Sequence, residues 1–401
     1  MTTIEHAVAR EAALDSARGW VIVTLGVCML TLIWGIVFTF TVYADRLAAT
    51  FGLTAVQVSS VFSTTSAALL AIGGLFGVFA ARVTLRPVLA LVAAGLAVSI
   101  ALLQIADSFA GVVLAFVVLG TAGGTAFTII ISLAPQWFDE YQGLAMSITM
   151  TGVGLGPLVM PQAWLWLFER TSFQTGFAAV VGLTAVFVGA SSLVYRRPPG
   201  TARDSNPVGP GWVRRRLSDR HFLSTAVGFP LVFTWFYVLS AHLVDILTAN
   251  SIGMGVAAAG ISIIGGVSVV TRIAGGYVGD RVGLQPTFLA SAGLAGVCAL
   301  VLPFVHSTVL AYAALFGFGI ALGPLATLWS PIILTAFGQE NATATVGLLN
   351  VSTAGFALVA PTGASVLHRV TGGWVVPLVA LGIVTILGLG FFYSGTGQAR
   401  V

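Results

Sequence analysis

Long runs of apolar residues, separated by short polar segments, fill almost the whole chain. A helix needs about twenty apolar residues to cross about 30 Å of hydrocarbon. Runs of about this length cover residues 20–43, 56–80, 87–106, 110–134, 143–168, 175–195, 222–243, 256–279, 285–305, 308–333, 342–367 and 374–393. The pattern predicts an all-α membrane protein with twelve transmembrane helices.

The composition indicates that lipid is the solvent of this chain. Charged residues make up only 7% of it and hydrophobic residues 57%, whereas soluble domains carry about 25% charged residues. The first nineteen residues mix acids and bases, which is typical of a cytosolic tail, and the run that follows is too long for a signal peptide. All seventeen basic residues are arginines.

The positions of the arginines predict the orientation. Thirteen of them lie in segments on the same side of the membrane as the N-terminus. Only Arg46, Arg170 and Arg369 lie in loops on the other side. Because basic residues concentrate in cytoplasmic segments, we expect both termini, and the polar segment at 196–221, to lie in the cytoplasm. The protein would then reside in the cytoplasmic (inner) membrane of the cell.

The two parts of the chain that flank this polar segment carry similar motifs. Residues 82–87 read RVTLRP, and residues 281–286 read RVGLQP, 199 positions later. At the same offset four further residues match; these are Gly120, Gly124, Thr128 and Phe138, which pair with Gly319, Gly323, Thr327 and Phe337. The repeat predicts an N-terminal six-helix half at 1–195, a linker at 196–221 and a C-terminal six-helix half at 222–401. Two parallel halves of this kind form the major facilitator fold.

One loop strengthens this interpretation. Gly276 to Gly283 resembles the G-x-x-x-D-R-x-G loop that major facilitator proteins carry between paired helices. The resemblance implies a role in conformational gating for Gly276, Asp280, Arg281 and the N-terminal counterpart Arg82. The N-terminal copy is degenerate, with Ala81 in place of the acid and Thr84 in place of the second glycine.

Three other stretches resemble the monocarboxylate and oxalate/formate porters of that superfamily. They are residues 18–21 (RGWV), Trp137-Phe138 followed by residues 143–146 (GLAM), and Thr271-Arg272. The sequence departs from those porters at Ser268, where the animal monocarboxylate porters have an aspartate, and at Glu140-Tyr141, where a basic pair is common. The resemblance implies transport by alternating access.

Arg272 is the one charged residue well inside a predicted span. It lies eight residues before Asp280, which places it about 12 Å from the helix end, near the midplane. A buried guanidinium is costly unless it is paired or solvated, and no predicted span carries an acid at that depth. We therefore expect Arg272 to bind a carboxylate through its planar fork. The alternative is a structural ion pair.

Four further polar residues fall at middle depth in spans that line the cavity of this fold. Asn350, Trp34, Thr125 and Tyr237 are predicted to bind the substrate beside Arg272, although each also fits an ordinary packing role. His242, near the outer end of its span, is interpreted as an interfacial residue, with titration at a gate as the alternative.

The expected function is secondary transport of a small organic monocarboxylate anion of two to about six carbons. Proton symport, anion exchange and uniport all remain open, and protons are a possible second partner. We expect a monomer that is not an enzyme, since no catalytic, cofactor-binding or metal-binding pattern occurs. The alternatives are a proton-driven multidrug exporter, which would need an acid within the membrane, and a sensor, which would carry a larger soluble region.

Overall fold

The computed structural model describes residues 15–79, 83–138, 141–198, 208–338 and 342–397, which are almost entirely helical and contain no strand. The α-helices are α2 (Ala17–Phe38), α3 (Phe40–Phe51), α4 (Ala55–Phe79), α5 (Leu85–Gln104), α6 (Phe109–Leu133), α7 (Gln142–Phe168), α8 (Phe173–Val194), α9 (Pro210–Ser218), α10 (Arg220–Ala249), α11 (Met254–Val282), α12 (Leu284–Val301), α13 (Thr308–Phe337), α14 (Ala342–Thr371) and α15 (Val375–Gly397). Short 3₁₀ turns follow α6 (Ala134–Trp137) and α12 (Leu302–Phe304).

Twelve of these helices are long and apolar enough to span a membrane, so the predicted number of spans is confirmed. The first span differs in detail, because the predicted run 20–43 is interrupted at Thr39. The Thr39 hydroxyl donates to the carbonyl of Gly35 and accepts a 2.9 Å bond from the indole of Trp164. Since this partner comes from α7, the interruption depends on tertiary packing rather than on the local sequence.

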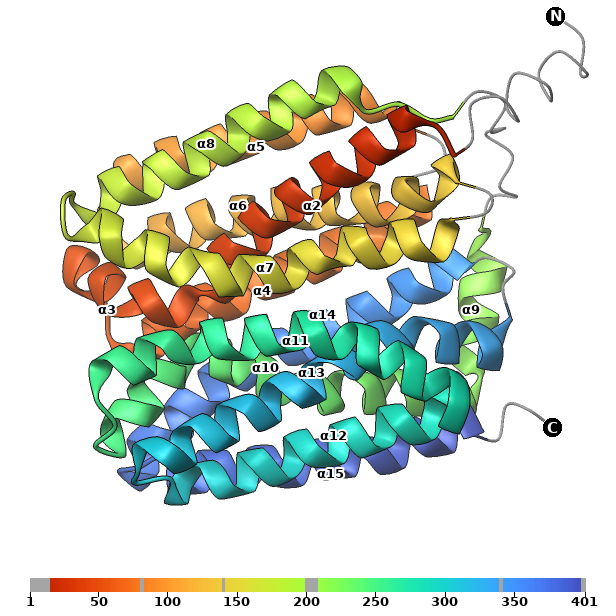
Figure 1. The fold of residues 1–401 in the computed structure, drawn as a ribbon. Helices are drawn as coiled ribbons and strands as arrows, with labels where there is room; N and C mark the ends of the chain where they lie inside the picture. Colours follow the sequence, from red (N-terminus) through yellow and green to blue (C-terminus); the bar gives the residue numbers. More distant parts are fainter. Residues whose placement is uncertain (1–14, 80–82, 139–140, 199–207, 339–341, 398–401) are drawn as a thin grey trace, which may run out of the picture.

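The spanning helices form two groups that lie side by side (Figure 1). The first bundle contains α2 to α8 and the second contains α10 to α15, and each has its own large cluster of buried apolar side chains. The start of α2, the end of α15 and helix α9 lie at the same end of the molecule, here called the linker end, and the opposite end is called the far end. That the bundles are related by a pseudo-two-fold axis stays a prediction.

Glycines of the proposed repeat lie at close helix crossings in both bundles. In the first, a Cβ added at Gly120 or Gly124 of α6 would collide with the backbone of α4, at Thr65 and Leu69 respectively. In the second, a Cβ on Gly323 of α13 would collide with α11. Small residues let transmembrane helices approach closely, so matching positions serve the same packing in each bundle.

Helix α9 lies inside the segment that the sequence indicated to be a solvated linker, and it was not predicted. The guanidinium of Arg216 donates a 2.7 Å hydrogen bond to the carbonyl of Phe337 at the end of α13. It also lies 5.5 Å from the ring centres of Trp212 and Phe337. A cation at a helix C-terminus is favourable because the last carbonyls there are partly negative. This contact fixes α9 to the second bundle.

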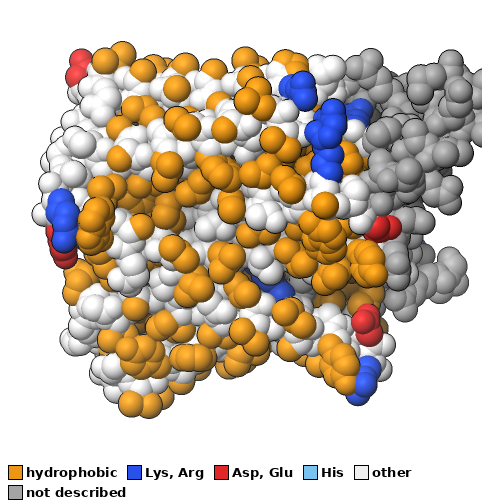
Figure 2. All heavy atoms as spheres, turned by 45° about the horizontal axis from the view of Figure 1, so that its top comes forward, with side chains coloured by type: hydrophobic (Ala, Val, Ile, Leu, Met, Phe, Trp, Pro, Cys, Tyr) orange, Lys and Arg blue, Asp and Glu red, His pale blue; other side chains and the backbone are white. Residues whose placement is uncertain are grey.

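The lateral surface suits a lipid environment. Figure 2 shows hydrophobic side chains spread over the visible face, with most of its charged side chains near the two ends. In lipid every backbone polar group needs a partner within the chain, and helices meet that need. The structure is thus a multi-pass helical membrane protein.

The glycine crossings generate a prediction about stability. Gly124→Ala and Gly323→Ala should each lower the free energy of unfolding by about 1–3 kcal/mol, because the added methyl overpacks a backbone contact. Thermal unfolding of the purified protein in detergent measures this. Gly293→Ala is the matched control, since nothing lies within 4 Å of its would-be Cβ. Equal stability of all three variants would contradict the packing argument.

Candidate functional site

A cavity of about 120 Å³ lies between the two bundles. Its walls come from α2, α4, α6 and α7 of the first bundle and from α10, α11, α13 and α14 of the second. The bundles touch on both sides of it. Toward the far end the ring of Phe38 lies 5.0 Å from that of Phe236, and toward the linker end the backbones of Gly74 and Gly347 meet closely.

Arg272 lines this cavity and is only 5% exposed. Its Nη1 donates a 2.8 Å hydrogen bond to the carbonyl of Met150 on α7, across the bundle interface. Its Nε is buried without a hydrogen-bond partner, and Nη2 makes no bond within the described residues. The neighbouring Ser268 hydroxyl donates to the carbonyl of Gly265 in its own helix. Within the described residues the guanidinium of Arg272 therefore makes one hydrogen bond, to Met150.

No carboxylate in the described part of the chain pairs with Arg272. The ion pairs there join Arg170 to Glu169 and His242 to Asp245, away from the cavity. A buried cation without a counter-ion is costly. A carboxylate is a suitable partner for a guanidinium, because two parallel N–H groups match its two oxygens. The arrangement is suited to bind one anionic group.

Packing of α13 positions the arginine. A Cβ on Gly323 would collide with the backbone at Thr271 and Arg272. Helix α13 therefore contacts α11 directly at Arg272. Thr271 donates a 2.9 Å bond to the carbonyl of Gly319, which ties the same two helices together. The close contact at Gly323 and the hydrogen bond to Gly319 together fix the position of Arg272 relative to α13.

Three of the four other predicted binding residues also line the cavity. They are Trp34, Tyr237 and Asn350, and their polar side-chain groups make no hydrogen bond to another described residue. Thr125 is not among the lining residues, and its hydroxyl donates to the carbonyl of Thr121. The structure therefore does not bring Thr125 to the site.

The sequence did not reveal the aromatic wall of the cavity. The rings that line it are Trp34, Phe38, Phe127, Phe229, Phe233, Phe236, Tyr237 and Trp329. They pack on one another, with Trp34 4.5 Å from Phe127 and Phe229 5.0 Å from Trp329. Clustered phenylalanines on one face of residues 229–236 were the available signal, but a span that is apolar all round does not show which face is inward.

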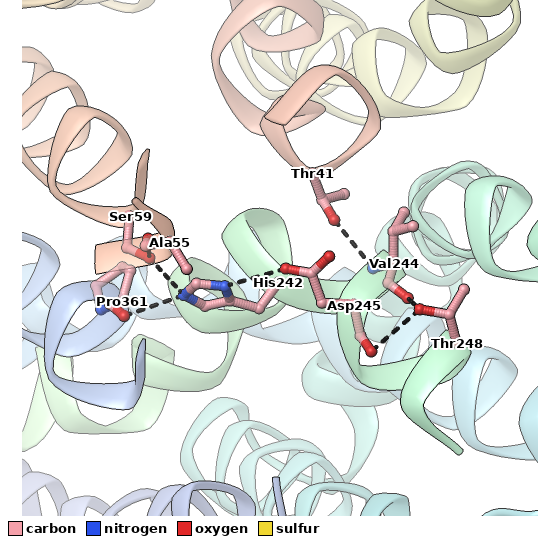
Figure 3. A network of polar contacts seen from close by, with 8 residues as sticks. All are labelled: Thr41, Ala55, Ser59, His242, Val244, Asp245, Thr248 and Pro361. Carbon is pink, nitrogen blue, oxygen red and sulfur yellow. Dashed lines mark hydrogen bonds and ion pairs between the residues drawn. The ribbon is translucent and has the colours of Figure 1, made fainter. Parts of the chain in front are cut away.

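At the far end a polar network joins the bundles (Figure 3). His242 is buried, and its Nε2 lies 3.0 Å from the carbonyl of Pro361 and 3.3 Å from the hydroxyl of Ser59. Because a carbonyl only accepts, Nε2 carries the hydrogen. Nδ1 lies 3.8 Å from the carboxylate of Asp245. His242 thus belongs to the contact between α4, α10 and α14.

A second acid lies near this network. Burial raises the pKa of the Asp45 carboxyl in α3 above its ordinary value, and the charge of Asp245 raises it further. The hydroxyl of Thr41 accepts a 2.9 Å bond from the backbone of Val244, which also joins α3 to α10. Like charges on facing helices oppose contact between the bundles at this end, and these hydrogen bonds favour it.

Comparison with known proteins places the chain in a family. The model of the Major Facilitator Superfamily matches residues 23–361. The chain belongs to this superfamily. It is 24% identical over 383 residues to a rat protein named monocarboxylate transporter 13, covering 94% of this chain and 88% of that one. It is 26% identical over 309 residues to the oxalate:formate antiporter of Oxalobacter formigenes, covering 71% and 69%.

The fold agrees with this membership. The structure is similar to that of a bacterial homolog of the human lysosomal transporter Spinster, with a TM-score of 0.73, 15% sequence identity and coverage of 96% of this chain and 98% of that one. At that identity the likeness shows the fold. The family match and this structural neighbour therefore agree on the fold of the chain.

The loop typical of the superfamily lies outside the cavity. Gly276 has open space where a side chain would stand, and Asp280 and Arg281 are exposed at the linker end of α11. The guanidinium of Arg281 lies 4.1 Å above the ring centre of Tyr277. Gly283 ends the helix with a φ of +111°, a conformation that favours glycine. Arg82 lies outside the described residues. The gating role of these residues stays a prediction.

The unpaired state of Arg272 generates a prediction about stability. Arg272→Met should raise the melting temperature of the ligand-free protein, because replacing a desolvated ionic group by an apolar one often stabilises by about 1–4 kcal/mol. If a hidden acid paired with Arg272, the same change would cost about 3–5 kcal/mol. Arg86→Met is the control, since Arg86 also bonds a backbone carbonyl, that of Leu193, but is exposed. A fall in melting temperature specific to Arg272→Met would refute the unpaired-cation description.

Proposed function

We propose that this protein transports a small organic monocarboxylate across the membrane by alternating access. The observation that carries the proposal is the guanidinium of Arg272, which lines an apolar cavity between the bundles and whose buried Nε has no hydrogen-bond partner in the described part of the chain. One unpaired cation matches one carboxylate. A dicarboxylate would bring a second charge into the apolar part of the cavity, which is costly.

Binding at Arg272 would engage both bundles at once. Nη1 is tied to the carbonyl of Met150 in the first bundle, while the arginine itself belongs to the second. A carboxylate on the remaining edge would complete the hydrogen bonding of the guanidinium. Trp34, Tyr237 and Asn350 line the same space and supply further polar groups of the proposed binding site.

Alternating access requires that the bundles separate at one end at a time. At the far end the contacts to be broken include the bonds of His242 to Ser59 and Pro361. At the linker end they include the close approach of Gly74 to Gly347. We propose that Gly276, Asp280 and Arg281 contribute to these rearrangements from the linker end of α11.

The arginine distribution supports an orientation with the linker end in the cytoplasm. We propose that the protein works as a monomer in the cytoplasmic membrane, with both termini inside. The domain division at 1–195, 196–221 and 222–401 fits this picture, with each half supplying one wall of the cavity. Symport with protons and exchange of anions both fit the site.

The bond geometry of Arg272 generates the first functional prediction. Arg272→Lys should weaken binding of the transported carboxylate by roughly ten- to a hundred-fold, because an ammonium cannot reproduce the bidentate fork. Uptake into proteoliposomes, measured as a function of substrate concentration, tests this. Thr125→Val serves as a control, since Thr125 does not line the cavity. Wild-type affinity in Arg272→Lys would contradict the anchor role.

The charge of the site predicts its selectivity. Monocarboxylates of two to about six carbons should compete for transport, and cationic dyes should not, because the described cavity wall carries a cation and no acid. A panel of labelled acids taken up with and without an imposed pH gradient also distinguishes symport from exchange. Ethidium efflux that disappears in Arg272→Gln would instead establish a drug exporter.

A further inference from the structure

The shape of the cavity restricts the substrate further. On α10, Phe229 and Tyr237 both line it and are eight residues apart, which corresponds to about 12 Å along the helix axis. On α11, Ile261 and Arg272 both line it and are eleven residues apart, or about 16 Å. The residues that line the cavity therefore extend over about 12–16 Å along the helix axes, with Arg272 nearer the linker end.

The charged group of the cavity lies toward one end of this length. Asn350 lies eight residues from the start of α14 and Arg272 ten residues from the end of α11, so both belong to the linker side of the cavity. Beyond them the wall is mostly aromatic and aliphatic, with Phe233, Phe236 and Ile264 among its side chains. It also carries polar groups, among them the phenol of Tyr237 and the indole N–H of Trp34. Toward the far end the ring of Phe38 closes over the space, 5.0 Å from Phe236.

The volume sets the size of the apolar part. An apolar protein cavity of about 150 Å³ accepts a benzene molecule, and this cavity measures about 120 Å³. A body of about one six-membered ring, or a chain of four to six carbons, fills such a space. A two-carbon acid would leave most of the apolar wall without a partner, and unfilled apolar space forfeits dispersion contacts.

We propose that the substrate is an amphipathic monocarboxylate whose carboxylate binds Arg272 and whose unbroken apolar body of about four to six carbons, as chain or ring, lies along the aromatic wall. This rests on the transport function proposed above. Burial of each methylene against that wall is worth about a four-fold gain in affinity. A second carboxylate at the other end of the chain faces apolar rings and abolishes binding.

The test is a homologous series of straight-chain acids, from acetate to octanoate, titrated calorimetrically into the purified protein at pH 7.5. The dissociation constant should fall about four-fold per added methylene up to about six carbons and then level off or rise. Adipate, which has the length of hexanoate with a second charge, should not bind. The same titrations into detergent micelles without protein provide the blank for partition of the acids into detergent, and those on Arg272→Lys should show binding weakened roughly ten- to a hundred-fold.

One cavity variant separates a specific fit from general hydrophobicity. Phe233 lines the cavity, so Phe233→Ala should move the tightest-binding acid to seven or eight carbons. The control is Phe316→Ala, because Phe316 is 50% exposed on the outer surface and does not line the cavity. Melting temperatures of both variants check that they are folded; if Phe233→Ala is not, Phe233→Leu replaces it, with a shift of about one carbon expected.

The possible failures differ from each other. If the dissociation constant does not depend on chain length, or if lactate binds more tightly than hexanoate, the amphipathic class is wrong, while Arg272-dependent binding still supports carboxylate transport. If no acid of the series binds the wild-type protein above the protein-free blank, the proposed transport function fails together with the amphipathic substrate class. If the chain length of the tightest-binding acid is the same in the folded Phe233 variants as in the wild-type protein, the apolar body of the substrate does not lie along this wall.

Discussion

A guanidinium surrounded by apolar side chains at the centre of a membrane protein needs an anion, and most of this structure can be understood from that need. Arg272 donates one hydrogen bond to a carbonyl of the first bundle and pairs with no acid of the described chain. The protein tolerates an incompletely bonded cation because α11 and α13 are held rigidly beside it, through Gly323 and Thr271. A buried cation that pairs with no acid of the described chain favours an anionic ligand.

The same arginine lies where the two bundles meet, so its bonding is linked to their relative position. Its Nη1 holds the carbonyl of Met150, and close contacts at Gly74 toward one end and at His242 toward the other keep the bundles together. A ligand can shift a conformational equilibrium only by binding its states unequally. A carboxylate held between the bundles meets that condition, since opening either end changes which groups surround it.

The sequence predicted the fold better than the details of the site. Twelve apolar runs were sufficient to predict the spans, because lipid demands continuous helices of fixed length. The depth of Arg272 followed from counting residues along its helix. The interruption at Thr39 did not follow, since it depends on Trp164 of α7, 125 residues away in the sequence. Thr125 does not line the cavity, and the sequence could not show this, because a span that is apolar all round does not reveal its rotation.

The aromatic wall of the cavity could not be predicted from the sequence either. Phe229, Phe233 and Trp329 are ordinary residues in a membrane helix, and only the assembled bundles bring them around one space. Helix α9 was missed because four prolines in its segment indicated an open linker, whereas the bond of Arg216 to the end of α13 supplies the tertiary contact that holds it. A single sequence shows where the transmembrane helices lie and how far along its helix a residue is placed. It does not show how each helix is rotated or which distant residues it contacts.

The central claim is that the guanidinium of Arg272 binds the carboxylate, and the Nε–H resonance of this residue in ¹⁵N-arginine-labelled protein tests it most directly. The resonance is identified by its loss in Arg272→Lys, and in the ligand-free protein it reports an Nε without a hydrogen-bond partner. Addition of hexanoate should move it downfield in a saturable manner, as a charge-assisted hydrogen bond forms. A resonance that stays in place while hexanoate is bound or transported would contradict the account.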